Sequence, residues 1–97
     1  MVTVVWETWL QISKASEGLE LTRRIWSDMK SFKGYCSHSM LVDQDNPAHI
    51  LVVSQWESRE AADRIRDEYA DSQNVKLLAP LLEKERNRWV FDEVVNN

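Results

Sequence analysis

The chain has 97 residues, of which 43% are hydrophobic and 29% are charged, and its formal net charge at pH 7 is −4. This length fits one domain over residues 1–97, the acidic balance argues against a nucleic-acid-binding surface, and a single cysteine excludes an intrachain disulfide. Because no apolar run approaches the roughly 18 residues of a membrane helix, and the N-terminus lacks a signal-peptide pattern, we expect no membrane association and a cytoplasmic location.

Residues 2–11 are predicted to form the first element, a strand whose two faces both carry bulky apolar side chains. Val4 and Trp6 fall on one face, and Val5 and Trp9 fall on the other, because side chains alternate along a strand. A strand with one face in solvent would carry apolar groups on one face only. The sequence therefore predicts a central strand that is covered on both sides.

Residues 16–32 change to the helical period, and their apolar stripe includes Leu19 and Ile25. We expect Ser16 to cap the N-terminus of this helix, because a serine oxygen accepts a hydrogen bond from a free backbone N–H there. Gly34 is well placed to end the helix in the left-handed conformation. The segment is therefore predicted to be one amphipathic helix against the sheet.

Two strands are predicted over residues 35–42 and 49–56, and the turn-rich loop DQDNPA between them makes them a hairpin. Ser58 is then expected to cap a second helix, which runs through the sequence SREAADRIRDEYA. Ile65 and Tyr69 lie on the apolar stripe of this helix. This part of the chain therefore predicts a hairpin followed by a helix.

Residues 72–82 are apolar but interrupted by Pro80, which predicts a short extra helical turn. Residues 85–95 alternate and are predicted to be the last strand. The order β-α-β-β-α-β is typical of the ferredoxin-like α+β fold, a four-stranded antiparallel sheet with two helices on one face. The first and third strands lie in the middle. Since the strands are apolar on both faces and no segment is left to cover the second, we expect a homodimer through that sheet face.

The sequence carries no convincing metal or nucleophile motif. Cys36, His38 and His49 are the obvious metal-ligand candidates, but nothing in their spacing fixes their convergence. Asp43 and Asp45 resemble the start of a calcium loop whose later glycine and glutamate are missing. There is no G-x-S-x-G elbow and no glycine-rich phosphate loop. We therefore expect no metal and no cofactor.

Aromatic residues are spread over the elements that surround the space between sheet and helices. A cavity lined by such side chains suits a flat aromatic ligand, but the same residues also suit a plain core, so the residues alone leave both interpretations open. The six residues are Trp6, Trp9, Trp26, Trp56, Tyr69 and Trp89.

Four segments carry a family resemblance: K-G-Y from Lys33, W-E-S-R-E-A from Trp56, Y-A-D-S from Tyr69, and L-A-P-L-L from Leu78. Together they resemble the antibiotic biosynthesis monooxygenase family of the dimeric α+β barrel superfamily, over about residues 3–95. The resemblance implies a small homodimer with a ligand cavity in each subunit. Some members of this family oxidise aromatic polyketides or quinols with dioxygen, without metal or flavin.

The resemblance also implies roles for single residues. Trp56 matches the family's tryptophan at the end of the third strand, which lines the cavity in aromatic oxygenases. Tyr69 stands where many members have a histidine, in an H-x-x-S pattern that here reads Y-A-D-S. Haem degradation is disfavoured, because the chain has no histidine after His49.

The function expected from these observations is a cofactor-independent monooxygenase that oxidises a small phenol or quinol with dioxygen. Two alternatives stay open: a non-catalytic dimeric module that binds a small molecule or a partner protein, and an isomerase on the same scaffold. The expected catalytic residues are Trp56, Tyr69 and Arg88, and the expected substrate-binding residues are Trp6, Trp26, Arg86 and Trp89.

Overall fold

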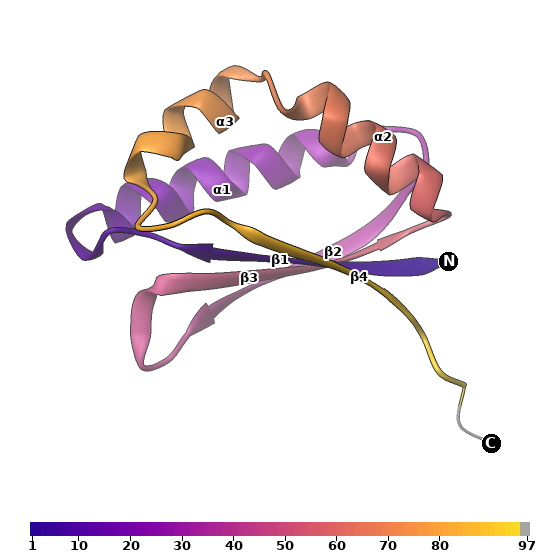
Figure 1. Cartoon of the computed structure of the whole chain (residues 1–97), viewed down its shortest axis with the longest axis horizontal. Helices are drawn as coiled ribbons and strands as arrows, with labels where there is room; N and C mark the ends of the chain where they lie inside the picture. Colours follow the sequence, from indigo (N-terminus) through magenta and orange to yellow (C-terminus); the bar gives the residue numbers. More distant parts are fainter. Residues whose placement is uncertain (96–97) are drawn as a thin grey trace.

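One antiparallel sheet, with its strands in the order β2–β3–β1–β4, organises the computed structural model, which describes residues 1–95. Helices α1, α2 and α3 all lie on one side of this sheet (Figure 1). The arrangement confirms the predicted ferredoxin-like fold, with the first and third strands in the middle. The elements are β1 (Val2–Trp9), α1 (Ala15–Met29), β2 (Tyr35–Asp43), β3 (Asn46–Trp56), α2 (Arg59–Tyr69), α3 (Gln73–Leu78) and β4 (Asn87–Asp92), with short 3-10 turns at Ile12–Lys14 and Ala79–Leu81.

The core lies between the sheet and the helices, on what we call the covered face of the sheet. Val4 of β1 and Ile50 and Val52 of β3 are almost fully buried there, because alternate side chains of the two central strands point to the helices. Ile25 of α1 and Ile65 of α2 close the core from above. Packing of these apolar side chains supplies most of the driving force that holds the helices on the sheet.

The first helix differs from its prediction at both ends. It begins at Ala15, after a 3-10 turn, and its N-cap is Lys14 without a side-chain hydrogen bond, so the prediction of a Ser16 cap is wrong. It ends at Met29 rather than at residue 32. Gly34 does have a positive φ of 96°, but in the loop before β2, where a Cβ would lie 2.6 Å from the Cβ of Ala61. Glycine is required there by close packing as well as by conformation.

The hairpin is tighter than predicted. β3 already begins at Asn46, so the turn between β2 and β3 is only Gln44 and Asp45 rather than the loop DQDNPA. Pro47 lies in β3 at an irregularity of the β2–β3 register and has no cross-strand partner, which explains why a residue without an N–H is tolerated there.

Two side-chain caps fix the helices that follow the hairpin. The predicted Ser58 cap is confirmed, since its Oγ accepts a hydrogen bond from the N–H of Ala61 at 3.1 Å. Ser72 caps α3 in the same way, with 3.3 Å from its Oγ to the N of Val75. A short helical segment was predicted here, and α3 followed by the turn around Pro80 confirms it.

The last strand is shorter than the predicted 85–95. β4 pairs only with β1, and its final residue Asp92 stands opposite Val2, the first residue of β1. Residues 93–95 have no strand to pair with, so the ladder stops at Asp92.

The second face of the sheet, here called the open face, carries no helix (Figure 1). Three large apolar side chains are about half exposed on it: Leu41 at 49%, Trp89 at 44% and Phe91 at 50%. The homodimer through this face stays a prediction that such exposure motivates. Within the described residues, no helix is both long enough and apolar enough to cross a membrane.

Candidate functional site

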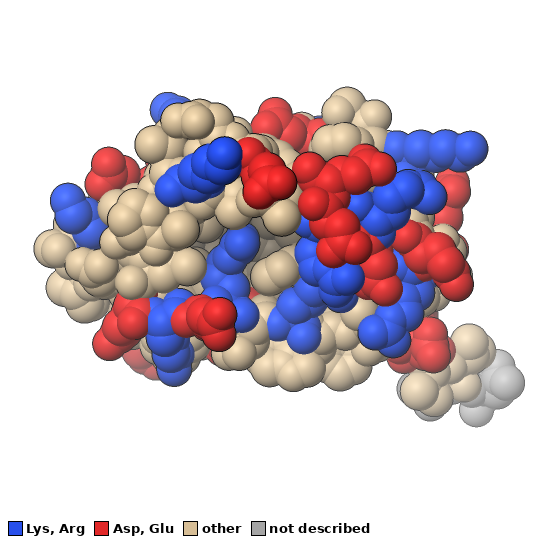
Figure 2. Space-filling model, turned by 45° about the horizontal axis from the view of Figure 1, so that its top comes forward, with Lys and Arg blue, Asp and Glu red and all other residues tan. Residues whose placement is uncertain are grey.

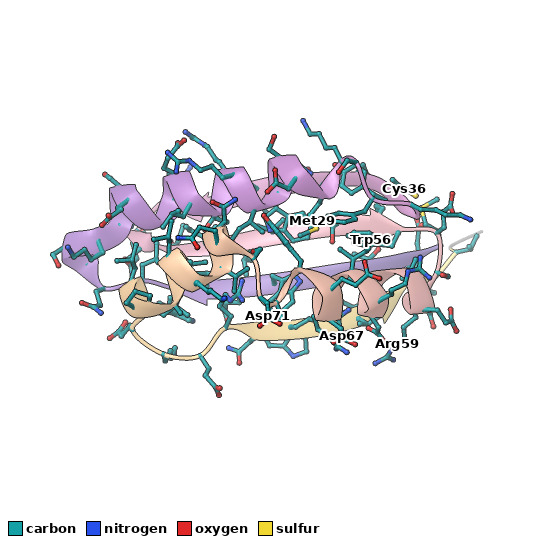
Figure 3. The ribbon with its side chains drawn as sticks, turned by 90° about the horizontal axis from the view of Figure 1, so that it is seen from above. Met29, Cys36, Trp56, Arg59, Asp67 and Asp71 are labelled. Atoms are coloured by element: carbon teal, nitrogen blue, oxygen red, sulfur yellow. The ribbon has the colours of Figure 1, made fainter. Side chains whose placement is uncertain are left out.

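A cavity of about 180 Å³ lies between the covered face of the sheet and the helices. Its walls come from β1 and β3 below, from α1 and α2 above, and from the segment that enters β4. Figure 3 shows Met29 and Trp56, two of the lining residues, between α1 and α2 when the molecule is seen from the helix side. The space-filling view shows a hollow near the middle of this side, with blue Lys and Arg atoms beside it (Figure 2).

Aromatic side chains form much of the wall. Four of the six tryptophan and tyrosine residues expected around this space line the cavity: Trp6, Trp26, Trp56 and Tyr69. They come from four different elements, so the fold gathers them although they are far apart in the sequence. The interpretation as a core and the interpretation as a cavity therefore both hold in part, because the same residues build a core and leave a cavity within it.

Trp56 is fixed by a hydrogen bond within its own strand and by a contact from the neighbouring strand. It is 3% exposed, and its Nε1–H donates to Ser54 Oγ at 3.0 Å, while Ser54 Oγ donates to the Val4 carbonyl at 3.1 Å. The Tyr35 ring meets it edge-on, with 5.7 Å between the centroids. The indole N–H of Trp56 is therefore already used inside the protein and is not free for a ligand.

Tyr69 presents its ring to the cavity and its hydroxyl to the ends of the helices. The hydroxyl donates to the carboxylate of Asp28 on α1. Asn74 Nδ2 on α3 lies 3.2 Å from Asp28 Oδ2 and 3.2 Å from the Tyr69 hydroxyl oxygen. Burial, and then this bond to Asp28, raise the pKa of the Tyr69 phenol. Tyr69 therefore stays protonated near neutral pH and joins three helices rather than acting as a base.

The charged side chains of the wall are arginines. The guanidinium carbon of Arg86 lies 4.9 Å from the centroid of the Trp6 ring, and that of Arg88 lies 5.8 Å from it. Arg88 is the cross-strand partner of Trp6, and its Nη2 donates to Asp63 at 2.8 Å. Its Nε is buried and has no hydrogen-bond partner in the structure. A buried N–H without an acceptor is costly, so this atom would gain from any acceptor that came within hydrogen-bond distance.

A third arginine, Arg66 on α2, also lines the cavity, and no sequence pattern indicated this role. It pairs with two carboxylates, those of Asp67 at 2.9 Å and Asp63 at 3.8 Å, and the bond to Asp67 is the main reason that its pKa is raised. No aspartate or glutamate belongs to the lining residues themselves. The described wall is therefore aromatic, aliphatic and cationic.

Two of the expected tryptophans lie outside this cavity. Trp89 was expected in the substrate site, but it projects from the open face, because Arg88 before it points to the helices and side chains alternate along β4. Trp9 is also on the open face, where its ring stacks on His49 with 3.7 Å between the centroids and 9° between the planes. The sequence placed apolar residues on both faces of these strands and gave no means of telling the faces apart.

The three metal-ligand candidates do not converge. Cys36 is exposed, His38 Nδ1 is hydrogen-bonded to the Tyr35 hydroxyl at 2.6 Å, and His49 lies on the open face. Within residues 1–95, no group of three or more histidine, cysteine, aspartate or glutamate side chains is arranged to hold a metal ion.

A polar cluster on the open face was not anticipated. His49 Nδ1 lies 2.9 Å from Asp43 Oδ2, and His49 Nε2 lies 2.7 Å from Glu7 Oε2. Asn87 donates to the other oxygen of Glu7 at 3.0 Å. The bond to Asp43 raises the pKa of His49, Asn87 and then His49 lower that of Glu7, and His49 lowers that of Asp43. The charged forms of all three groups therefore stabilise one another.

The comparisons with known proteins agree with this architecture. The sequence model of the antibiotic biosynthesis monooxygenase family matches residues 1–70. A search of curated proteins finds no significant sequence match.

Several solved structures share the fold at low sequence identity. SnoaB, a cofactor-independent oxygenase from Streptomyces nogalater, is 16% identical with a TM-score of 0.84, and the match covers 98% of this chain and 94% of SnoaB. Rv0793 from Mycobacterium tuberculosis is 16% identical with a TM-score of 0.79, covering 98% and 96% of the two chains. A conserved protein from Methanosarcina mazei Go1 is 18% identical with a TM-score of 0.76, covering 96% and 92%.

Proposed function

Because the chain belongs to the antibiotic biosynthesis monooxygenase family, we propose that it oxidises a small phenol or quinol with dioxygen, without a metal or a flavin. One observation carries this proposal. The cavity combines an aromatic wall with an unpartnered buried donor, Arg88 Nε, beside the ring of Trp6. Such a site suits a flat ring that carries an oxygen anion.

The size of the cavity limits the substrate. Sites for drug-sized ligands have volumes of about 300–1,000 Å³. The cavity here is about 180 Å³, which suits a compound of one or two rings rather than a large polycyclic one.

The chemistry needs no electron donor besides the substrate. A phenol with a free para position reacts with one O₂ to give a para-quinone and one water. One oxygen atom enters the ring and the other leaves as water, and the four electrons that reduce O₂ come from the ring. The reacting form is the phenolate, because the anion gives up an electron more readily than the neutral phenol.

The residues of the wall divide this work between them. The Arg88 guanidinium donates to the phenolate oxygen and stabilises its charge, which lowers the pKa of the bound phenol. Trp6, Trp26 and Trp56 hold the ring between the sheet and α1 and exclude water. The Tyr69 ring closes the cavity under the helix ends that its hydroxyl joins.

The proposal includes a homodimer through the open face. Its support is the exposure of Trp89, Phe91 and Leu41 on a sheet face that no helix of the described chain covers. Burying these side chains against a second copy removes apolar area from water.

A non-catalytic binding module is the alternative that one observation favours. The polar groups of Trp56 and Tyr69 are used inside the protein, so neither is free to donate to a reacting oxygen. An isomerase is less well supported, since an isomerase must move a proton and no carboxylate or histidine belongs to the described wall.

Oxygen uptake with α-naphthol tests the proposal directly. We expect one O₂ consumed for each naphthoquinone formed, in the presence of a metal chelator and without added flavin. With isotopically heavy O₂, one labelled oxygen appears in each quinone. A folded protein that binds α-naphthol without consuming O₂ supports the binding module instead, and stoichiometric metal or flavin in the active protein contradicts the proposal.

A further inference from the structure

Arg86 differs from the other two arginines of the cavity in having no acidic partner. Arg88 pairs with Asp63, and Arg66 pairs with Asp67. Arg86 forms no ion pair and no side-chain hydrogen bond within residues 1–95, and burial alone acts on its pKa, lowering it. An arginine remains a cation near neutral pH even so. The structure therefore holds one positive charge in a cavity wall without compensating it.

The ring of Trp6 explains how this charge is tolerated in the free protein. The Arg86 guanidinium lies over the face of that ring, at 4.9 Å from the centroid. A cation over the face of an indole is attracted by the negative charge of the ring face. This contact keeps the flat guanidinium at the edge of the cavity without using its N–H donors. The donors therefore stay available to a group that enters.

The environment favours an anion at this position. The wall contains three arginines and no aspartate or glutamate, and the Asp63 carboxylate is already shared between Arg88, Arg66 and Arg59. A guanidinium presents paired N–H donors whose spacing matches the two oxygens of a carboxylate. A single phenolate oxygen uses only part of that donor set, and Arg88 Nε already suits it.

From this geometry we infer that the natural ligand is an aromatic acid, whose carboxylate binds the Arg86 guanidinium while its ring lies against Trp6 and its phenolic oxygen reaches Arg88. This inference deepens the proposed function and rests on it for the role of the phenolic oxygen. The binding of the carboxylate at Arg86 stands without any turnover.

A matched pair of hydroquinones tests this inference. Gentisate and its neutral amide share a ring, both hydroxyls and nearly the same size, and they differ in the charge of one substituent. Titration calorimetry on the wild-type protein is expected to show gentisate binding about ten to a hundred times more tightly than the amide. Equal affinities for the two compounds, or no binding of gentisate, would overturn the inference.

Variants of Arg86 locate the preference in the structure. In Arg86→Gln the affinity for gentisate is expected to fall to that of the amide, while the affinity for the amide stays within about threefold of wild type. Arg86→Lys keeps the charge but loses the paired donors, so we expect an intermediate preference. Arg64→Gln, an exposed position on α2, is the control for the loss of one positive charge and is expected to bind both compounds like wild type. A preference that survives in Arg86→Gln would place the carboxylate elsewhere and contradict the inference.

Oxygen uptake separates this inference from the proposed function. If gentisate binds in preference to its amide but α-naphthol is not oxidised, the proposed oxidation fails and the acid site stands. If α-naphthol is oxidised but gentisate and its amide bind with equal affinity, the oxidation stands and the acid site fails.

Discussion

The two faces of one sheet treat their charged side chains in opposite ways. On the open face, both ring nitrogens of His49 meet a carboxylate, and Glu7 is bonded again by Asn87. On the covered face, among residues 1–95, Arg86 has no acidic partner and the buried Nε of Arg88 has no acceptor. Both sets of residues come from the same strands or from the segments next to them, so the difference lies in the partners and not in the fold.

The paired charges of the open face stabilise the fold, whereas the unpaired donors of the covered face are available to a ligand. A charge whose partners are all present gains nothing from a ligand, whereas an unpartnered donor gains a bond when an anion enters. The apolar groups follow the same division. The tryptophans of the covered face line a cavity, while Trp89 and Phe91 of the open face remain about half exposed and suit a surface that buries against another copy.

The largest effect is expected from a charge at the centre of the proposed dimer surface. We expect wild-type protein at micromolar concentration to have the mass of two chains by light scattering. Trp89→Glu should shift it to the mass of one chain, with association weakened on the order of a hundredfold or more, because the dimer would have to bury an unpaired carboxylate. Trp89 is exposed in the single chain, so the fold of that chain should survive.

Two further variants sharpen this test. Trp89→Gln replaces the same ring without a charge and should weaken the dimer less than Trp89→Glu does. Arg64→Glu adds a negative charge on α2, on the other side of the sheet, and should leave the mass of two chains unchanged. A wild-type protein with the mass of one chain would contradict the dimer.

A smaller effect, confined to chemistry, is expected on the covered face. Arg88→Gln should lower the rate of α-naphthol oxidation about a hundredfold, since it removes the cation that stabilises the phenolate. The far-UV circular dichroism should stay that of wild type, because the loss of one ion pair to Asp63 leaves the core intact. Arg64→Gln is the matched control and should keep the wild-type rate. A rate for Arg88→Gln within threefold of wild type would remove Arg88 from the reaction.

Trp56→Phe is expected to act on stability first. The change removes the N–H that donates to Ser54 Oγ and leaves a small gap, at a cost of about 1–2 kcal/mol. For a domain of this length each kcal/mol lowers Tm by about 4–8 °C. Below Tm, turnover should stay within about tenfold of wild type, because the phenyl ring still forms the wall.

The matched control is Trp26→Phe, since Trp26 lines the same cavity from α1. It should lower Tm less, because no hydrogen bond to Ser54 is lost. An unchanged Tm for Trp56→Phe together with a hundredfold loss of turnover would show that the indole N–H serves the substrate after all.

The sequence predicted the order of the elements because hydrophobic period and turn residues are local signals. The Ser58 cap is one example, since the preference of serine for a helix N-terminus acts within three residues. Prediction from the sequence failed where the end of a strand or the direction of a side chain depends on partners far along the chain. β4 ends at Asp92 because β1 begins at Val2, and Trp89 faces away from the cavity because of its register with β1.

The candidate site was likewise predictable only where local signals in the sequence determine it. Arg86 and Arg88 were expected in the site from their place at the start of the predicted last strand, but their different states depend on Asp63 and Trp6, which no local pattern connects to them. The cluster of His49, Asp43 and Glu7 joins three strands and was missed for that reason.

The smallest effect is expected from the two histidines, whose pKa values are shifted in opposite directions on the two faces of the sheet. Bonding to Asp43 raises the pKa of His49 above 6.5, whereas burial, and then the charge of Lys30, lower that of His38 below it. Glu7 and Asp43 belong to the same cluster as His49. Their pKa values are lowered from the ordinary values of 4.5 for Glu7 and 3.8 for Asp43. The open-face cluster is therefore most stabilising where all three groups are charged, between about pH 4.5 and 6.5.

Stability measured across pH tests this opposition. The His49 contribution is complete below pH 6.5 and is lost as the pH rises through its higher folded pKa, so His49→Gln should remove a decline in Tm above pH 6.5. His38 in the folded state resists protonation, so its contribution is lost as the pH falls below 6.5, and His38→Gln should remove a decline on the acid side. Each change should be a few degrees in Tm, read by thermal denaturation at matched ionic strength. If both variants altered the same side of the profile, the contrast between a compensated open face and a desolvated covered face would be wrong, because burial and pairing act on an imidazolium with opposite signs.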